Sequence, residues 1–508
     1  MSSRKISRAL ISVFYKDNLE PIIHELGKNG VEFVSTGGTQ EFIEKLGYKV
    51  TPVEELTGYP SIFGGRVKTL HPAVFGGILF RRDEPSDLKQ AEEFKIAPID
   101  LVIVDLYPFE ETVAKGGSES EVIEKIDIGG ISLIRGAAKN FNDVVIVSSR
   151  SQYTEFTDLL KQKGGSTDLE DRKHFAALAF EVTSHYDAAI FQYFNSGYQL
   201  PVFKASFQNG RVLRYGENPH QKGTYFGDLD GLFDQLNGKE LSYNNLVDVD
   251  AAVNLIQEFD GQTAFVIIKH TNACGVATAA TVREAYLKAF AADTISAFGG
   301  VLATNQTVDL AAAEELNKLF FEILIAPSFD EDALALLRSK KNRMILLQKR
   351  PLTARKQFKS ILDGVIEQDA DLHTDRREDL KVVTKRNPSE QEIDALLFAS
   401  KICKHTKSNT IVLANDGQLI ASGVGQTSRV DALKQAIEKA AAFGFTLQGA
   451  VMASDAFFPF PDCVEIADKH GIRAVIQPGG SVKDQDSINY CDEHDMAMVF
   501  TGIRHFKH

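Results

Sequence analysis

"VEFVSTGGTQEFIEKLG", residues 31–47, places an apolar run, a glycine turn and an amphipathic helical pattern in immediate succession. The apolar run has the length of a buried strand, and Gly37 and Gly38 end it before the helical period begins. Parallel strands are joined by crossover connections, usually helices, so a strand leading into a helix is the unit of a parallel sheet. The stretch therefore predicts an α/β fold.

The same alternation runs through the first two hundred residues. Strand patterns occupy 8–14, 31–36, 99–109 and 143–149, and helical patterns occupy 18–30, 39–47 and 151–165. Strands that read as nearly continuous apolar runs are buried on both faces. We expect a mostly parallel sheet covered by helices on both sides.

The regular rhythm breaks at "FNSGYQLPVF", residues 194–203, where Gly, Pro and Ser interrupt any period. A chain of 508 residues is too long for one core. We predict two domains, 1–198 and 199–508. The second domain returns to strands and helices with repeated small-residue turns, and we find no internal repeat in its sequence.

Composition narrows the classes of function. The formal net charge of −13 disfavours general binding to nucleic acids and to anionic membranes. The four cysteines are scattered, without a C-x-x-C pair or zinc-ligand spacing, which is typical of a reduced protein. We find no signal-peptide pattern and no apolar stretch near twenty residues. These features predict a cytoplasmic protein that does not span a membrane.

The glycine turn after the second strand pattern has two interpretations. Gly37 and Gly38 allow close approach of a ligand to the backbone, and the following helix N-terminus favours an anion such as phosphate. Thr36 and Thr39 add hydroxyl groups. The alternative is a tight turn in which Thr39 caps the helix. The motif is neither a Walker loop nor a dinucleotide fingerprint, which excludes the usual ATP and NAD sites.

Charged residues follow in "FGGRVKTLHP", residues 63–72. Arg66 and Lys68 lie on a glycine-flanked loop, where cations can hold an anion or a developing oxyanion. A basic loop that only faces solvent would have the same pattern.

Two further stretches carry polar residues next to buried elements. Tyr107 ends an apolar strand pattern, at the edge where open α/β sheets bind ligands. Asp127 precedes a glycine pair and a helix pattern on which Ser132, Arg135 and Lys139 share one face. A structural salt bridge would explain Asp127 with a lysine, but it would not explain the clustered glycines.

The second half contains "FVIIKHTNACGVA", residues 265–277. Adjacent side chains of a continuing strand point to opposite faces, so Lys269 and His270 can serve one site only if the strand ends there. The small residues that follow predict such an end. Imidazole suits proton transfer near neutral pH, and an ammonium can stabilise an oxyanion. A structural role for His270 is the alternative.

Three more segments combine polar and aromatic residues. "LRYGENPHQ", 213–221, is a surface turn or a polar binding loop that carries Arg214 and Tyr215. "SDAFFPFPD", 454–462, is either packing under a loop or an apolar slot for a planar ring. "RHFKH", 504–508, follows a strand pattern directly, which suggests a terminus that is held in place rather than frayed.

Together these motifs resemble one family, the bifunctional purine-biosynthesis enzymes that combine AICAR transformylase with IMP cyclohydrolase. "STGGT", "GGRVKTLHP", "LYPF", "IDIGG…RGAAKN", "LRYGENPHQ", "KH…G", "SDAFFPFPD" and "RHFKH" occur in family order over essentially the whole chain. No single motif is specific, but the ordered set is.

The resemblance implies two reactions. The second domain would transfer a formyl group from 10-formyltetrahydrofolate to the amine of AICAR, and the first would close the product FAICAR to IMP with loss of water. The implied folds are a methylglyoxal-synthase-like α/β domain and a transformylase domain of cytidine-deaminase-like α/β units. It also implies a homodimer with shared transformylase sites, and neither a redox cofactor nor a catalytic metal.

Residue roles are likewise implied by the resemblance. The residues matching catalytic positions are Lys68, Tyr107, Asp127 and Lys139 in the cyclohydrolase and Lys269 and His270 in the transformylase. The residues matching cyclohydrolase substrate contacts are Ser12, Lys16, Thr36, Gly37, Gly38, Thr39, Arg66 and Thr69. Those matching nucleotide or folate contacts are Arg214, Tyr215, Gly299, Asn409, Arg429, Phe457, Asp462, Ser481 and Arg504. Asp105 stands where the family pattern has Asn, and its charge is expected to affect nucleotide binding or its pH dependence.

Two other functions are compatible with the same sequence. In the first, only one activity persists and the other domain is a relic. In the second, the first domain is a nucleotide sensor that binds IMP without turning over FAICAR. Tyr107, Asp127 and Lys139 argue against a sensor, which needs anion contacts but no proton transfer.

Overall fold

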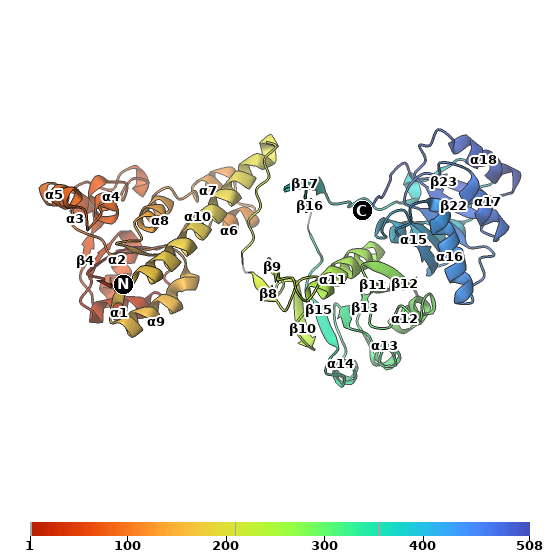
Figure 1. Ribbon diagram of the computed structural model, residues 1–508, viewed down its shortest axis with the longest axis horizontal. Coiled ribbons are helices and arrows are strands. Elements are labelled where there is room, and N and C mark those ends of the chain that lie inside the picture. Colours follow the sequence, from red (N-terminus) through yellow and green to blue (C-terminus); the bar gives the residue numbers. More distant parts are fainter. Residues whose placement is uncertain (1–2, 209, 354–355) are drawn as a thin grey trace. The chain divides into compact units, whose positions relative to one another are not determined.

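The computed structural model describes residues 3–208, 210–353 and 356–508 (Figure 1). The chain forms two compact units, Met1–Phe207 and Gln208–His508. Helix α10 (Leu169–Tyr198) ends at the residue where we predicted the domain boundary, and the extended segment after it belongs to the first unit.

The first unit is built on a parallel sheet, as predicted. Its five strands lie in the order β4-β3-β2-β5-β6, and every neighbouring pair is parallel. The strands are β2 (Arg8–Ser12), β3 (Glu32–Ser35), β4 (Val50–Pro52), β5 (Leu101–Val104) and β6 (Val145–Val147). A separate antiparallel pair joins β1 (Arg4–Lys5) to β7 (Ser166–Thr167).

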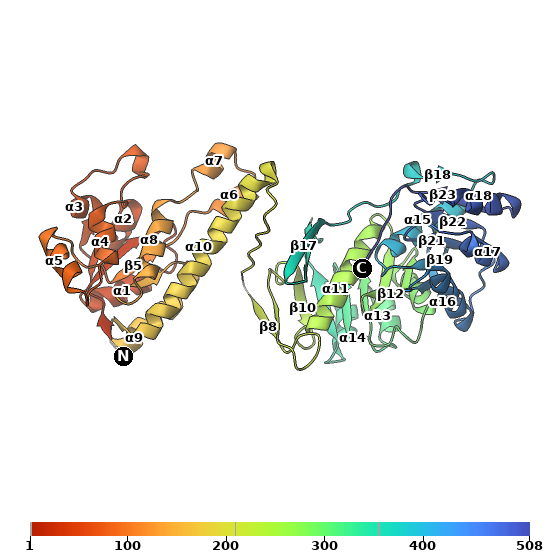
Figure 2. The ribbon, with the colours of Figure 1, turned by 45° about the horizontal axis from the view of Figure 1, so that its top comes forward.

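Helices cover both faces of this sheet. Alternate strand residues point to opposite faces, so Ala9 and Ile11 pack with α1 and α9, whereas Leu10 packs with α4, α8 and α10. Figure 2 shows α10 as one long helix along this unit. The other helices are α1 (Glu20–Lys28), α2 (Gly37–Lys45), α3 (Val53–Thr57), α4 (Pro72–Leu79), α5 (Pro85–Glu93), α6 (Phe109–Ala114), α7 (Glu119–Ile123), α8 (Gly129–Lys139) and α9 (Tyr153–Lys163).

The strand order reverses between β2 and β5. From β2 the chain adds β3 and β4 on one side, and then returns to add β5 and β6 on the other. Connections leave β2 and β5 in opposite directions, which opens a crevice beyond their carboxyl ends. The fold therefore places a ligand-binding position next to Ser12 and Asp105, the residues at those two ends.

The second unit is built on a twelve-stranded mixed sheet. Its order is β10-β15-β14-β13-β11-β12-β20-β19-β21-β22-β23-β18. These strands are β10 (Phe233–Asn237), β11 (Ala264–Lys269), β12 (Asn272–Thr278), β13 (Val301–Thr304), β14 (Ile323–Ala326), β15 (Met344–Gln348), β18 (Lys381–Val382), β19 (Ile411–Asn415), β20 (Gln418–Gly423), β21 (Val451–Ser454), β22 (Ala474–Gln477) and β23 (Ala497–Phe500). Two separate hairpins pair β8 (Arg211–Leu213) with β9 (Gly223–Tyr225) and β16 (Lys356–Ile361) with β17 (Gly364–Asp369).

This sheet contains a repeat that the sequence did not reveal. The hairpin β11–β12 followed by parallel β13, β14 and β15 matches the hairpin β19–β20 followed by parallel β21, β22 and β23. Helices α12–α14 cover one half and α16–α18 the other, while α11 and α15 share the opposite face. These helices are α11 (Tyr243–Ile256), α12 (Val282–Ala291), α13 (Leu310–Leu316), α14 (Glu331–Arg338), α15 (Glu390–Lys404), α16 (Arg429–Ala442), α17 (Asp462–Lys469) and α18 (Asp484–Glu493).

The strand ends at Lys269, as the sequence predicted. His270 and Thr271 form a two-residue turn between β11 and β12, and both have positive φ, at 51° and 66°. Two-residue hairpin loops favour such turns because their twist matches that of the strands. His270 is therefore presented on a tight turn.

A membrane-spanning helix needs sufficient length and apolar character. Within residues 3–208, 210–353 and 356–508, no helix is long and apolar enough to cross a bilayer. The four cysteines are all buried and unpaired.

Substitution of Gly423 in β20 tests how closely this strand packs on α16. A Cβ on Gly423 would lie 1.8 Å from the carbonyl oxygen of Ala432, which is helix backbone and cannot move aside cheaply. We expect Gly423→Ala to lower the free energy of unfolding by about 1–3 kcal/mol. The chain contains no tryptophan, so unfolding in urea is best followed by circular dichroism. Gly364→Ala is the control, because its nearest neighbour atom lies at 3.6 Å; equal stability of the two variants would contradict the prediction.

Candidate active sites

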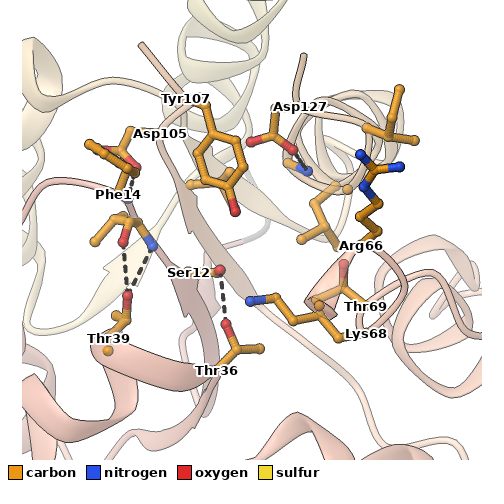
Figure 3. Close-up of a pocket in the computed structure, with 18 of the residues that line it drawn as sticks. Ser12, Phe14, Thr36, Thr39, Arg66, Lys68, Thr69, Asp105, Tyr107 and Asp127 are labelled. Atoms are coloured by element: carbon orange, nitrogen blue, oxygen red, sulfur yellow. Dashed lines mark hydrogen bonds between the residues drawn. The ribbon is translucent and has the colours of Figure 1, made fainter. Parts of the chain in front are cut away.

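A cavity of about 690 Å³ lies in the first unit at the carboxyl ends of β2, β3 and β5 (Figure 3). The predicted residues that line it are Ser12, Lys16, Thr36, Gly38, Thr39, Arg66, Lys68, Thr69, Asp105, Tyr107 and Asp127. They come from five separate segments of the chain. Gly37 lies in the turn but does not line the cavity.

One end of the cavity is cationic. Lys16 and Lys68 are close enough for the charge of Lys68 to lower the pKa of Lys16, an effect added to the larger one of burial. The Lys16 ammonium lies 4.0 Å from the position of a Cβ on Gly38, at the start of α2. Two ammonium groups beside a helix N-terminus form a site for a dianion such as phosphate.

The hydroxyl groups around this end have different roles. Ser12 and Thr36 hydroxyls lie 3.2 Å apart. Thr36 is the N-cap of α2, and within the described residues no side chain bonds to the amides of its first turn. The alternative that Thr39 caps this helix is wrong, because the Thr39 hydroxyl binds the backbone of Val13 instead, at 3.0 and 3.2 Å.

The other end carries a buried acid and a phenol. Asp127 accepts a hydrogen bond of 2.6 Å from the Gly130 amide at the start of α8. Burial raises the pKa of Asp127, and it also raises that of Tyr107, which the charges of Asp127 and Asp105 raise further. Figure 3 shows the Tyr107 hydroxyl pointing into the cavity towards Ser12 and Lys68. A carboxyl with a raised pKa is suited to exchange protons with a ligand, and a neighbouring phenol can relay a proton because its hydroxyl both donates and accepts.

The Asp105 carboxylate faces the backbone of the loop that follows β2. It accepts hydrogen bonds from the amides of Phe14 and of Tyr15, the latter at 3.0 Å. Burial raises the pKa of Asp105, although both amides act to lower it. A carboxylate at this position therefore offers the loop after β2 one more strong acceptor than an asparagine would, in addition to a charge near the cavity.

Sequence reasoning missed several lining residues. Glu124 forms an ion pair with Arg66, and Phe14 lines the cavity next to Tyr107. Neither belongs to a recognisable motif. Only the position of Phe14, two residues after a strand that ends at the crevice, could have indicated it.

Lys139 is the predicted catalytic residue of the first unit that does not line this cavity. It lies in the last turn of α8 and is exposed, whereas Gly129 and Gly130 in the first turn line the cavity. Nine residues of helix separate Lys139 from Gly130 by about 14 Å. Its catalytic role stays a prediction.

In the second unit, strand direction gathers the predicted residues at one edge of the sheet. Strands β11, β20, β21, β22 and β23 run the same way, and β13 and β19 run oppositely. The ends of the first set of strands and the starts of β13 and β19 lie at the same edge of the sheet. Most predicted residues of this unit lie at or next to those positions. They are Lys269, His270, Gly299, Asn409, Arg429, Phe457, Asp462, Ser481 and Arg504.

At the β11 end, Lys269 and His270 are held differently. The Lys269 ammonium donates to the carbonyl oxygens of Phe298, at 2.9 Å, and Gly299, at 3.1 Å. The His270 side chain is exposed on its turn, and Asp248 fixes that turn by accepting a 2.7 Å bond from the Thr271 amide. Asp248 was not predicted.

The C-terminal segment is held in place, as predicted. Lys507 and Ser408 exchange two bonds, of 2.9 and 3.0 Å. The Phe506 ring lies under the guanidinium groups of Arg504, at 4.3 Å, and Arg429, at 5.7 Å. Arg429 also pairs with the buried Asp455 at 3.3 Å. The tail therefore brings two predicted arginines together.

Other predicted residues lie apart from Lys269. Arg214 and Tyr215 follow β8 in a separate hairpin, where the guanidinium donates to the phenol at 3.1 Å. Asp462 begins α17 and Ser481 follows β22. Adjacent strands are about 4.8 Å apart, so four strand spacings put the ends of β11 and β21 about 20 Å from each other.

Comparisons with known proteins agree with this architecture. The model of the MGS-like domain matches residues 18–132, so the first unit is an α/β domain of that class. The model of the AICARFT/IMPCHase bienzyme matches residues 137–439. The chain belongs to the AICARFT/IMPCHase bienzyme family, and it is a bifunctional purine-biosynthesis enzyme with AICAR formyltransferase and IMP cyclohydrolase activities.

Relatives match over the full length. A protein of Bacteroides thetaiotaomicron named bifunctional purine biosynthesis protein PurH is 61% identical, covering 100% of this chain and 99% of its own. Proteins of the same name from Aquifex aeolicus and Bacillus subtilis are 48% and 46% identical, each covering 99% of this chain and 100% of its own.

Substitution of Gly130 tests whether the Asp127 carboxylate takes part in IMP formation. A Cβ on Gly130 would lie 2.4 Å from Oδ2 of Asp127, so Gly130→Ala must displace that carboxylate. We expect the kcat of IMP formation from FAICAR to fall at least about tenfold, with formyl transfer unchanged.

Gly136→Ala on the same helix is the control, because its Cβ would meet Phe75 at an ordinary 3.5 Å. Full cyclohydrolase activity in Gly130→Ala would contradict a role for the Asp127 carboxylate.

Proposed function

We propose that the cavity of the first unit is the cyclohydrolase site. The supporting observation is its polarity: Lys16 and the start of α2 lie at one end, Tyr107 and Asp127 lie at the other, and the charge of Lys68 acts on both Lys16 and Asp127. The phosphate of FAICAR binds the cationic end. The formylated heterocycle then reaches the phenol and the carboxyl group.

Ring closure is intramolecular, so the site mainly holds the folded conformer of the substrate and moves protons. The carboxamide nitrogen attacks the formyl carbon, the new C–N bond forms, and the carbonyl oxygen leaves as water. Because that oxygen leaves as water, it must receive two protons. One is lost by the carboxamide nitrogen and the other by the formamide nitrogen, which becomes a ring nitrogen. Asp127, whose pKa burial raises, is suited to accept and return a proton, and Tyr107 to relay one through its hydroxyl. Lys68 is suited to stabilise the transient oxyanion.

Paired substitutions separate the two activities. We expect Lys68→Ala to lower the kcat/KM of FAICAR cyclisation at least about a hundredfold and to leave tetrahydrofolate release unaffected. His270→Ala should do the reverse. Both rates are measured on one purified preparation with AICAR and 10-formyltetrahydrofolate, and with FAICAR alone.

Each competing function gives a different outcome. A sensor would bind IMP but leave FAICAR unchanged even in the unsubstituted protein. A relic domain would make one of the two substitutions silent. Lys139→Ala belongs in the same series, because its predicted role in proton transfer predicts lost cyclisation despite its distance from the cavity.

We place formyl transfer at the edge of the second sheet. AICAR's amine is a poor nucleophile, because its lone pair is delocalised into the ring. His270 accepts its proton as the amine attacks the formyl carbon of 10-formyltetrahydrofolate, and Lys269 stabilises the oxyanion. The bond from the formyl carbon to the folate nitrogen then breaks, that nitrogen takes the proton from His270, and tetrahydrofolate leaves. The exposed turn position of His270 supports this role.

Two copies of the chain complete each transformylase site in this proposal. The ends of β11 and β21 are separated by about 20 Å on one sheet, which is too far for one nucleotide to reach both His270 and Asp462. A homodimer brings His270 of one copy next to Asp462 of the other. The enzyme acts in the cytoplasm, an assignment that its buried free cysteines support.

Mixed dimers test the shared site. His270→Ala and Asp462→Ala chains with different affinity tags are co-expressed, and the doubly tagged dimer is purified. One of its two sites then carries both substitutions and the other carries none, so we expect about half of the unsubstituted formyl-transfer activity.

The matched control pairs His270→Ala with Lys269→Ala. These residues belong to the same group at β11, so their mixed dimer should stay inactive. No recovery in the first pair would show that each site belongs to one chain. Recovery in the control would show that Lys269 and His270 of one chain do not act in the same site.

A further inference from the structure

Phe14 lines the cavity of the first unit, although no sequence motif indicated it. It lies two residues after the end of β2 and is 40% exposed. Most of its neighbours in the cavity are charged, hydroxylic or glycine. An aromatic ring exposed in such a site contributes little to the core, and it offers a planar apolar surface to a ligand.

The ring belongs to a defined aromatic group. Its centroid lies 5.6 Å from that of Tyr107, with an interplanar angle of 68°, in an edge-to-face arrangement. The Lys125 ammonium lies 5.5 Å from the Phe14 centroid and 6.0 Å from that of Tyr107. A cation shared by two rings favours this arrangement of the pair. Phe14 is thus oriented relative to the phenol proposed to move protons.

The loop that carries Phe14 is fixed along its backbone. Asp105 accepts from the Phe14 and Tyr15 amides, and the Lys16 ammonium donates to the carbonyl oxygens of Val13, at 2.7 Å, and Phe14, at 2.9 Å. The Tyr15 ring lies 3.9 Å from the Arg150 guanidinium carbon. The loop is therefore held in place before any ligand arrives.

Only a carboxylate satisfies both amides through separate oxygens. An asparagine has one carbonyl oxygen, and its amide group would face a second N–H donor. Asp105 thus holds Phe14 more firmly than an asparagine would.

We propose that Phe14 is a substrate-positioning residue of the cyclohydrolase reaction, with its exposed ring against the planar heterocycle of FAICAR and its loop held by Asp105. The proposal rests on the assignment of this cavity as the cyclohydrolase site. It involves no covalent step: Phe14 limits the orientation of the heterocycle in front of Tyr107 and Asp127.

The test measures cyclisation kinetics on the full-length enzyme. Phe14→Leu keeps an apolar side chain but removes the flat ring, so we expect KM for FAICAR to rise about tenfold. Phe14→Tyr, which restores the ring, should stay within about twofold of the unsubstituted enzyme. Asp105→Asn should raise KM in the same direction by a smaller factor. Phe94→Leu is the matched control, because Phe94 is exposed and does not line the cavity.

The outcomes are distinguishable. A Phe14→Leu enzyme with unchanged KM overturns the proposal, including the case in which kcat alone falls, because lost active protein lowers kcat without changing KM. Formyl transfer by the same preparation reports its folding. If Lys68→Ala leaves cyclisation intact, the cavity assignment fails. If Lys68→Ala abolishes cyclisation and Phe14→Leu leaves KM unchanged, only the role of Phe14 fails.

Discussion

The reversal of strand order between β2 and β5 is the constraint on which the first unit depends. A parallel sheet built outward in both directions from a central pair must open a crevice at that pair. The residues after β2 and β5 consequently meet there, although almost a hundred positions separate them in the chain. The turn after β3 adds a helix N-terminus, and two loops close the remaining sides. The chemistry of the cavity is set by which residues stand at those strand ends.

In the second unit, strand direction likewise determines which residues lie together at one edge of the sheet. Its two halves have the same topology. The pairing of their strands places the loops that carry the predicted residues of both halves at one common edge. That edge is long, because the sheet has twelve strands. A long edge can hold separate groups of binding residues, which suits a reaction between two large substrates.

Much of this could be read from the sequence, and the reasons for the remainder are physical. Lys68, Tyr107 and Asp127 stand in motifs with glycines, and they do line one cavity. The strand order, the repeated topology of the second unit and the contact of Phe14 with Tyr107 depend on pairings between distant segments, which no local pattern encodes. The role of Asp105 depends on two backbone amides, which have no signature in side-chain sequence. Lys139 shows the opposite case, since its match to a motif does not bring it into the cavity.

The join between the halves of the large sheet is narrow. Only Ala277 and Gln418 pair directly between β12 and β20, although the Thr278 amide also bonds to the carbonyl oxygen of Gly417 at 2.8 Å. Each half takes its five strands from one continuous stretch of chain, 264–348 or 411–500. Contacts close in sequence form fastest, so each half is able to fold as a separate nucleus during synthesis. Joining the two halves then buries the hydrophobic cluster that α11 and α15 share and completes the edge along which the predicted residues lie.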